Sequence, residues 1–172
     1  KKINPKNRLF NKKLGGGAIL DLGCYPVSFS TLIASLVSKI NYDKVKIINK
    51  KKEIGSTGVD VDAYMELVFE NNFKSKISSS FTQNLGKETK IYGSMGEIVI
   101  NDTWTAQNSK IIIKKIGRED VILKIESNQN IYSYEIKALS QCILDKKVNV
   151  AFPGLTIVDT VNNMKIIDRW KS

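Results

Sequence analysis

The sequence of 172 residues contains no histidine, and this absence excludes more functions than any other count. Ser-His-Asp and Cys-His nucleophilic sites, imidazole zinc sites and any histidine general base need a residue that the chain lacks. A proton that moves at a site in this chain must therefore be carried by a carboxylate, a tyrosine, a lysine or water.

Cysteine is also scarce. Cys24 and Cys142 lie in separate apolar segments, without the Cys-x-x-Cys spacing of metal and redox motifs. Because a free cysteine behaves as a small hydrophobic residue, we expect both to be buried, reduced thiols. A redox-sensitive role stays open as the alternative for Cys24, which lies beside the candidate site described below.

Long apolar runs and nucleotide-binding motifs are missing too. No apolar run reaches the ~18 residues that span a bilayer, and the basic N-terminal residues lack the apolar core of a secretion signal. We therefore expect a cytoplasmic protein without a membrane partner. Neither Gly-x-Gly-x-x-Gly nor a Walker-type Gly-Lys-Ser/Thr occurs, so the residues alone do not indicate dinucleotide binding.

Arginine is rare although the net charge is +10. Of the 27 basic residues only Arg8, Arg118 and Arg169 are arginines, and the other 24 are lysines. Base readout and bidentate phosphate contacts favour arginine over lysine. We therefore expect no nucleic-acid partner and interpret the scattered lysines as a solvated surface. A weak attraction to anionic substrates or polyanions stays open.

The apolar pattern that is present predicts helices at both ends of the chain and strands between them. Helical spacing predicts a helix over 18–37, with a kink or restart at Pro26, which cannot donate a backbone hydrogen bond. Alternating apolar residues and short turns predict antiparallel strands over 62–70, 73–81, 87–92, 97–101, 111–113 and 121–123. Helical spacing returns over 131–145 and 156–170.

We expect each of the last two helices to bury one apolar stripe. The stripe of 131–145 comprises Ile131, Tyr134, Ala138, Leu139, Cys142 and Ile143, and that of 156–170 comprises Ile157, Val161, Met164 and Ile167. Thr156 and Asp159 have the spacing of a capping box. The predicted fold class is α+β, an open and mainly antiparallel sheet with helices packed on one face, in a single domain over residues 1–172.

The most informative stretch runs from Gly15 to Pro26. Three glycines open it, and Asp21 and Tyr25 follow four residues apart. On a helix this spacing places both side chains on one face, which predicts a proton-handling site or, alternatively, an ordinary surface pair. Two further carboxylates, Asp60 and Asp62, lie at a strand start without other ligands, so we expect them to face solvent and not a metal.

This stretch, with Arg8 before it, resembles the second domain of the glucose–fructose oxidoreductase, inositol dehydrogenase and MocA-type oxidoreductase family. The resemblance covers nearly the whole chain. Segments that follow in the order of the family are Thr57–Asp60, Ile91–Ile98, Asn130–Ile136 and Asp159–Trp170.

The resemblance implies one half of a two-domain, NAD(P)-dependent oxidoreductase. A Rossmann domain, with the catalytic lysine of a Glu-Lys-Pro element, precedes this kind of domain in the family and is not part of the sequence. We therefore expect a fragment of a longer enzyme, inactive alone, whose NAD or NADP is bound mainly by the absent domain. The implied substrate is a sugar, polyol or diol.

The family's catalytic pair maps onto Asp21 and Tyr25. Many members have histidine at the second position. In having tyrosine there, this sequence resembles the dihydrodiol dehydrogenase-like members. The resemblance implies that Tyr25 exchanges the hydroxyl proton and that Asp21 orients the substrate or tunes the phenol. Arg8, Gly16 and Gly17 are the predicted substrate-binding residues. The alternatives stay open that Arg8 is a solvated loop residue or contacts a neighbouring subunit, and that the glycines are an ordinary flexible helix entry.

The resemblance also implies a homodimer or tetramer that forms through the sheet face not covered by helices, where we place Tyr64, Val68, Ser78 and Ser80. The alternative that the sequence leaves open is a non-enzymatic module that uses the same sheet to bind a ligand or to dimerise.

Overall fold

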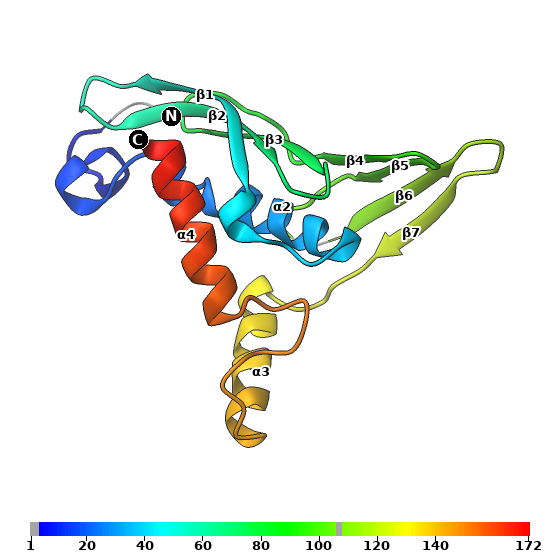
Figure 1. Ribbon diagram of the computed structural model, residues 1–172. Coiled ribbons are helices and arrows are strands. Elements are labelled where there is room, and N and C mark those ends of the chain that lie inside the picture. Colours follow the sequence, from blue (N-terminus) through cyan, green and yellow to red (C-terminus); the bar gives the residue numbers. More distant parts are fainter. Residues whose placement is uncertain (1–3, 106–107) are drawn as a thin grey trace. The chain divides into compact units, whose positions relative to one another are not determined.

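The computed structural model describes residues 4–105 and 108–172, which form two compact units (Figure 1). Unit 1 contains the described residues up to Leu85 together with Leu155–Ser172, and unit 2 is Gly86–Gly154. The helices and strands in chain order are 3₁₀ turns η1 (Arg8–Phe10) and η2 (Lys12–Leu14), α1 (Ala18–Asp21), α2 (Cys24–Val37), 3₁₀ turn η3 (Tyr42–Lys44), β1 (Lys46–Ile54), β2 (Asp60–Val68), β3 (Lys74–Ser80), β4 (Thr89–Gly93), β5 (Gly96–Ile100), β6 (Ser109–Lys115), β7 (Val121–Ile125), α3 (Ile131–Leu144) and α4 (Ile157–Lys171).

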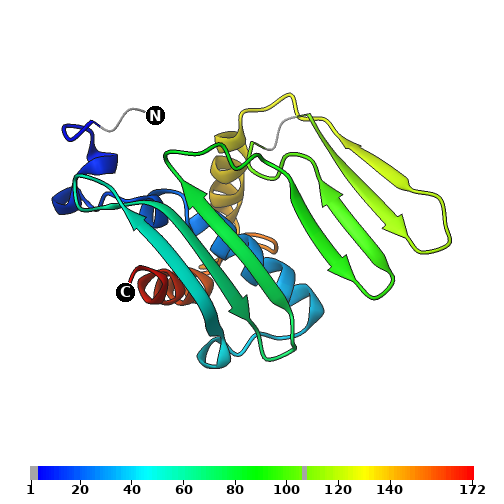
Figure 2. The ribbon, with the colours of Figure 1, turned by 90° about the horizontal axis from the view of Figure 1, so that it is seen from above.

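Unit 1 is a three-stranded antiparallel sheet, in the order β1-β2-β3, with α1, α2 and α4 on one face (Figure 2). Its core forms where Ala63, Met65 and Leu67 of β2 meet these helices. The helices contribute the buried side chains of Ile19, Val27, Ala34, Ile166, Ile167 and Trp170. The sheet can expose its other face because antiparallel strands tolerate a solvated side.

The alternation predicted for β2 and β3 is confirmed. Residue pairs across the strands place Tyr64 opposite Lys51 and Ser78, and Asp62 opposite Glu53 and Ser80. These side chains lie on the face away from the helices, because they alternate with the buried residues. We call this surface, with Glu66 and Lys76 of the next row, the open face of unit 1.

The helix predicted over 18–37 is interrupted, but not at the residue that we expected. α1 ends at Asp21 and α2 begins at Cys24, so the break lies at Leu22 and Gly23, before Pro26. Pro26 falls in the first turn of α2, where a missing N–H removes no helical hydrogen bond. Close packing explains why residue 23 has no side chain, because a Cβ there would lie 2.8 Å from Trp170 Cζ3.

The C-terminal helix α4 begins with the predicted capping box, in which the Thr156 hydroxyl accepts from Asp159 N–H and the Asp159 carboxylate accepts from Thr156 N–H. Its predicted buried face is wrong except for Ile167. The buried residues are Asn163, Ile166, Ile167 and Trp170, whereas Ile157, Val161 and Met164 are exposed. Helical spacing correctly indicated an apolar stripe, but unit 1 covers a neighbouring side of the helix.

The far end of α4 is held by two lysines of β1. Lys50 Nζ donates to the Arg169 carbonyl at 2.8 Å, and Lys52 Nζ donates to the Lys171 carbonyl. Cations are favourable at helix C-termini, where carbonyls lack helical partners. Lys51 lies between them in the strand and points to the open face, so the three consecutive lysines do not share one face of the sheet.

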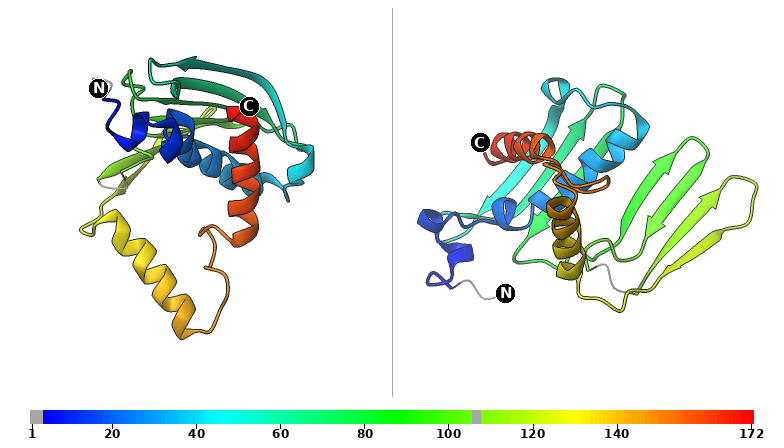
Figure 3. Two further views of the ribbon diagram at one scale, coloured as in Figure 1. Left: turned by 90° about the vertical axis from the view of Figure 1, so that its left-hand side faces the viewer. Right: turned by 90° about the horizontal axis from the view of Figure 1, so that it is seen from below.

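Unit 2 contains a four-stranded antiparallel sheet in the order β4-β5-β6-β7 (Figure 3), and its strands match the remaining predicted strands. The turn between β4 and β5 needs Gly96, whose φ is +146°. The register places eight aliphatic residues on one face of this sheet, which we call the aliphatic face. They are Ile91, Ile98, Ile100, Ile111, Ile113, Val121, Leu123 and Ile125.

Helix α3 of unit 2 is confirmed as a helix, with the Asn130 side chain capping its first turn. The prediction that its apolar stripe is buried is wrong for all members but Cys142; Ile131 is half-buried, and Leu139 and Ile143, for example, are exposed. Periodicity places apolar residues on one side of a helix, but such a side is buried only where another element covers it.

The α+β class, with open antiparallel sheets and helices, is confirmed. The single domain stays a prediction. In the described part of the chain no single helix is long and apolar enough to cross a membrane; Lys12–Asp21 and Cys24–Val37 reach that length only as a pair bent by 42°. Ile19, Val27 and Ala34 of this pair lie in the core of unit 1, and core helices often have such composition.

Candidate active site

The candidate site begins with a tightly folded segment before α1. The side chains of Asn7 and Asn11 cap η1 and η2 by accepting from Leu9 N–H and Lys13 N–H. Gly15 then takes the left-handed conformation, with φ +71°, and reverses the chain. The next two amides bond back to the same segment, Gly16 N–H to the Asn11 carbonyl and Gly17 N–H to the Leu9 carbonyl, both at 2.9 Å.

Gly16 and Gly17 are buried against the chain itself. A Cβ on Gly16 would lie 2.6 Å from the Leu9 carbonyl oxygen. Gly17 has φ +124°, and a Cβ there would lie 3.0 Å from Asp60 Cγ and closer still to Oδ1. The glycines therefore permit close packing of backbone on backbone and of backbone on Asp60. A substrate contact by Gly16 and Gly17 stays a prediction.

Asp60 contradicts our expectation that it faces solvent. Only 5% of the residue is exposed, and its Oδ2 accepts from Ile19 N–H at 2.7 Å. The carboxylate thus satisfies a donor in the first turn of α1, whose preceding residue, Gly17, has no side chain to do so. One sequence signal could have indicated this burial: Asp60 lies between Val59 and Val61, which are both buried.

Arg8 and Asp21 are brought together. Arg8 Nη2 lies 3.0 Å from Asp21 Oδ1, so that η1 is tied to the last residue of α1. The Arg8 side chain is 65% exposed and the Asp21 side chain 22% exposed, so the pair lies at the surface. We expected Arg8 to contact a substrate; its partner within the described residues is the candidate catalytic carboxylate.

Tyr25 is the second residue of α2 and is 58% exposed. Because the helix is interrupted at Leu22 and Gly23, Asp21 ends the short α1 and Tyr25 lies in the separate helix α2, so the two do not share the one continuous helix face that we expected. Tyr25 N–H still donates to the Leu22 carbonyl at 3.3 Å, so the chain keeps turning through the break. The phenol therefore reaches solvent one turn after the carboxylate.

The two cysteines are free thiols, as predicted, but only Cys142 is buried. Cys24 is partly buried. This burial raises the pKa of its thiol, backbone hydrogen bonds lower it in part, and the charge of Asp21 raises it again. Because the thiolate is the reactive form, a raised pKa disfavours the redox-sensitive alternative for Cys24.

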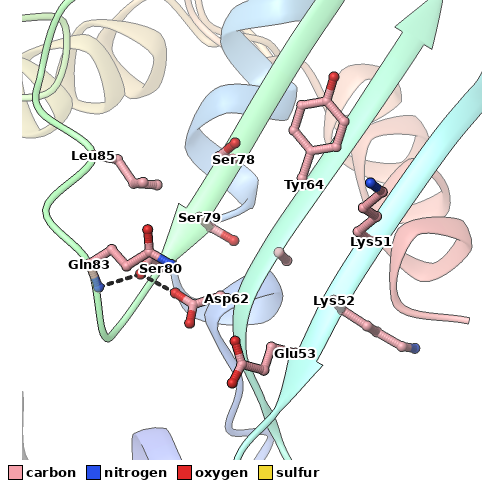
Figure 4. Close-up of a pocket in the computed structure, with 11 residues that line it drawn as sticks. Lys51, Lys52, Glu53, Asp62, Tyr64, Ser78, Ser79, Ser80, Gln83 and Leu85 are labelled. Atoms are coloured by element: carbon pink, nitrogen blue, oxygen red, sulfur yellow. Dashed lines mark hydrogen bonds between the residues drawn. The ribbon is translucent and has the colours of Figure 1, made fainter.

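A second polar feature is a hollow of about 330 Å³ on the open face of unit 1 (Figure 4). Ser80 and Thr82 donate hydroxyl hydrogen bonds to Asp62, the latter at 2.5 Å, and the Tyr64 hydroxyl donates to Glu66. The bond to Glu66, followed by burial, raises the pKa of Tyr64 to about 12. In the described ranges no group of three or more acidic or cysteine side chains could hold a metal ion.

Comparison with known proteins gives concordant results. The family model of the GFO/IDH/MocA C-terminal domain matches residues 1–99. The trans-1,2-dihydrobenzene-1,2-diol dehydrogenase of Xenopus laevis is 32% identical over 141 residues, which are 80% of this chain and 41% of that protein. The human protein of the same name is 22% identical over 142 residues, 79% of this chain and 40% of that protein.

Solved structures show the same fold. An aldose-aldose oxidoreductase from Caulobacter crescentus, complexed with glycerol, has a TM-score of 0.73 at 18% identity, over 98% of this chain and 50% of that one. A 3-ketoreductase from Actinomadura kijaniata, in complex with NADP and TDP-benzene, has a TM-score of 0.76 at 17% identity, over 96% and 48%. The chain thus spans about half the length of these proteins.

Proposed function

This chain belongs to the GFO/IDH/MocA family, and on that premise we propose that it is the substrate-binding and catalytic part of an NAD(P)-dependent oxidoreductase. The substrate is a sugar, polyol or diol, oxidised or formed at a hydroxyl-bearing carbon. The observation that carries the proposal is the exposed Tyr25 phenol, one turn after the Asp21 carboxylate that Arg8 holds.

The glycine run is not built as a cradle for the phosphates of a dinucleotide. The Gly16 and Gly17 amides already donate to carbonyls of the chain, and the Asp60 carboxylate beside Gly17 would repel a phosphate. We propose that NAD or NADP is held mainly by a part of the longer protein. Bound there, it supplies the acceptor or donor of a hydride at the carbinol carbon.

The role of Tyr25 follows from the proton that this reaction releases. As an alcohol becomes a carbonyl, its O–H proton must leave, and Tyr25 accepts it; in the reverse direction the phenol returns it. A phenol of ordinary pKa near 10 is a poor base at neutral pH, so a nearby cation must favour the phenolate. We assign that cation to the family's lysine, because Arg8 is already paired with Asp21.

Asp21 and Arg8 orient the substrate in this proposal. An acceptor carboxylate and a guanidinium with further donors can hydrogen-bond two hydroxyl groups of a polyol. Both lie at the surface, and the exposed Arg8 guanidinium keeps further N–H donors for a substrate oxygen while it holds Asp21.

The test is a dehydrogenase screen of the full-length protein beside its Tyr25→Phe variant. NAD and NADP are offered with aldoses, inositols and diols. We expect Tyr25→Phe to lower kcat/KM at least a hundredfold, whereas Tyr132→Phe, which alters another exposed tyrosine, changes it less than twofold. Equal activity in the two variants would assign the proton transfer to another group.

We also propose that the protein self-associates through an uncovered sheet face. The open face of unit 1 is largely polar, so the aliphatic face of unit 2 is the better candidate. Val121 and Ile122 are neighbours in β7, 48% and 56% exposed, on opposite faces. Sedimentation analysis should show that Val121→Lys dissociates the oligomer and that Ile122→Lys leaves it intact; a monomeric wild type would contradict the proposal.

The hollow on the open face supports the second candidate, a non-enzymatic ligand-binding module. Hydroxyl, carboxylate and ammonium groups line it together with Tyr64, a combination suited to a polyhydroxylated ligand. This candidate predicts calorimetric binding of a sugar by the full-length protein without NAD or NADP, lost in Tyr64→Ala, together with no activity in the screen.

A further inference from the structure

Asp60, the first residue of β2, is a buried carboxylate. None of the ion pairs among the described residues involves it, although it is 5% exposed. A buried charge is costly unless hydrogen bonds satisfy it. Serine, threonine or asparagine would cap a helix without that cost.

The carboxylate acts on a helix that cannot persist alone. α1 has four residues, far fewer than an isolated helix needs. Asp60 Oδ2 holds its first turn through Ile19 N–H, and Arg8 holds its last residue, Asp21. Asp60 is the first residue of β2, so this hydrogen bond attaches α1 to the sheet, between residues 41 positions apart in the sequence.

The absence of a side chain at residue 17 lets the backbone pack closely against Asp60. Gly17 lies against the Asp60 carboxyl group, and Gly17 N–H donates to the Leu9 carbonyl, next to Arg8. A displacement of Asp60 therefore changes the start of α1 and the segment that carries Arg8. Both determine where the Asp21 carboxylate lies, one turn before Tyr25.

We propose that Asp60 is a positioning residue for Asp21 and Tyr25, acting through Ile19 N–H and the Gly17 backbone without touching the substrate. This inference rests on the proposed function of that pair. Misplacing a reacting group by about 1 Å costs on the order of a hundredfold in rate. We therefore expect Asp60→Ala to lower kcat of the full-length enzyme at least tenfold, with KM for NAD or NADP changed less than threefold.

Two further variants separate positioning from stability and from charge. Asp60→Asn keeps an oxygen that can accept from Ile19 N–H, so it should restore kcat to within threefold of the wild type. Asp102→Ala in unit 2 also removes a carboxylate that accepts from backbone N–H groups, those of Trp104 and Thr105, and should leave kcat unchanged.

Hydrogen exchange measured by mass spectrometry supplies a readout independent of activity. In Asp60→Ala the amides of residues 18–22 should exchange at least tenfold faster, whereas those of Asp60→Asn stay within threefold and those of Asp102→Ala stay at the wild-type rate. Faster exchange with kcat within threefold of the wild type would overturn the proposal, because Asp60 would then be only a structural cap.

The remaining outcomes are also decisive. Equal losses of kcat in Asp60→Asn and Asp60→Ala would overturn positioning in favour of a direct effect of the charge. If the wild-type enzyme oxidises or reduces no substrate of the screen, the proposed function fails. Exchange then decides alone: a rate at residues 18–22 unchanged in Asp60→Ala overturns the attachment, and a faster rate upholds it.

Discussion

Replacing Gly17 by alanine tests the packing on which the candidate site depends. The backbone there has φ +124°, a conformation that costs a residue with a Cβ about 1–3 kcal/mol. The new methyl group would overlap the Asp60 carboxyl group, and moving it away forfeits a hydrogen bond to a charged acceptor, about 1.5–3 kcal/mol. Together these terms lower the free energy of unfolding by about 4 kcal/mol.

Gly15→Ala is the matched control, two residues earlier in the same turn. Gly15 also has a positive φ, +71°, but a Cβ added there would have nothing within 4 Å, so only the backbone cost of about 1–2 kcal/mol applies. With a urea dependence of about 2 kcal/mol per molar, the unfolding midpoints should fall by about 2 M for Gly17→Ala and by less than about 1 M for Gly15→Ala.

The assay is urea unfolding followed by far-UV circular dichroism, with both variants measured beside the wild type. Equal midpoints for the two alanine variants would refute the reasoning, because the contact between Gly17 and Asp60 would then contribute nothing. A Gly17→Ala variant that also carries Asp60→Ser, whose shorter side chain makes room for the methyl group, should recover part of the loss.

Two other predictions concern charges. Lys50→Met should lower the free energy of unfolding by about 0.5 kcal/mol, because it removes a cation from the last turn of α4, and Lys52→Met should have the same effect. Lys51→Met, on the opposite face, should leave this free energy unchanged. Urea unfolding midpoints of the three variants measure the difference. Burial and the Asp159 carboxylate raise the pKa of Tyr42 to about 12 in the folded state, so the resulting stability is present below pH 10 and lost from about 10 to 12. Tyr42→Phe should flatten that alkaline decline in melting temperature; an unchanged decline would assign it to other groups.

The strands of unit 1 could be predicted because each residue's face is encoded locally. Ala63, Met65 and Leu67 alternate with polar residues, and shifting the register by one would exchange the two faces. The capping box of α4 is local as well, with its two side chains three residues apart. Such features need no knowledge of what lies elsewhere in the chain.

The errors concern features decided by distant residues. Asp60 is buried because Ile19, 41 residues earlier, presents a donor to it. Gly23, at the break, packs against the ring of Trp170, near the end of the chain, as well as against the backbone of Ile19. The apolar stripes of α3 and α4 were correct as periodic patterns. On α4, however, unit 1 covers the side with Asn163, Ile166 and Trp170, which shares only Ile167 with the predicted stripe.

The candidate site was predictable only in part, because some of its residues are close in sequence and others are not. Asp21 and Tyr25 are close in sequence, and the glycine run draws attention to them. Arg8 was expected to contact a substrate, whereas its pairing with Asp21 depends on the way η1 folds back onto α1.

The return of α4 to unit 1 has a consequence for biosynthesis. The core around Met65 and Leu67 is closed by Ile166, Ile167 and Trp170, which are translated about a hundred residues later. Until then α1 and α2 cover only part of the apolar side of the earlier strands, whereas unit 2 is continuous in sequence and can fold during synthesis.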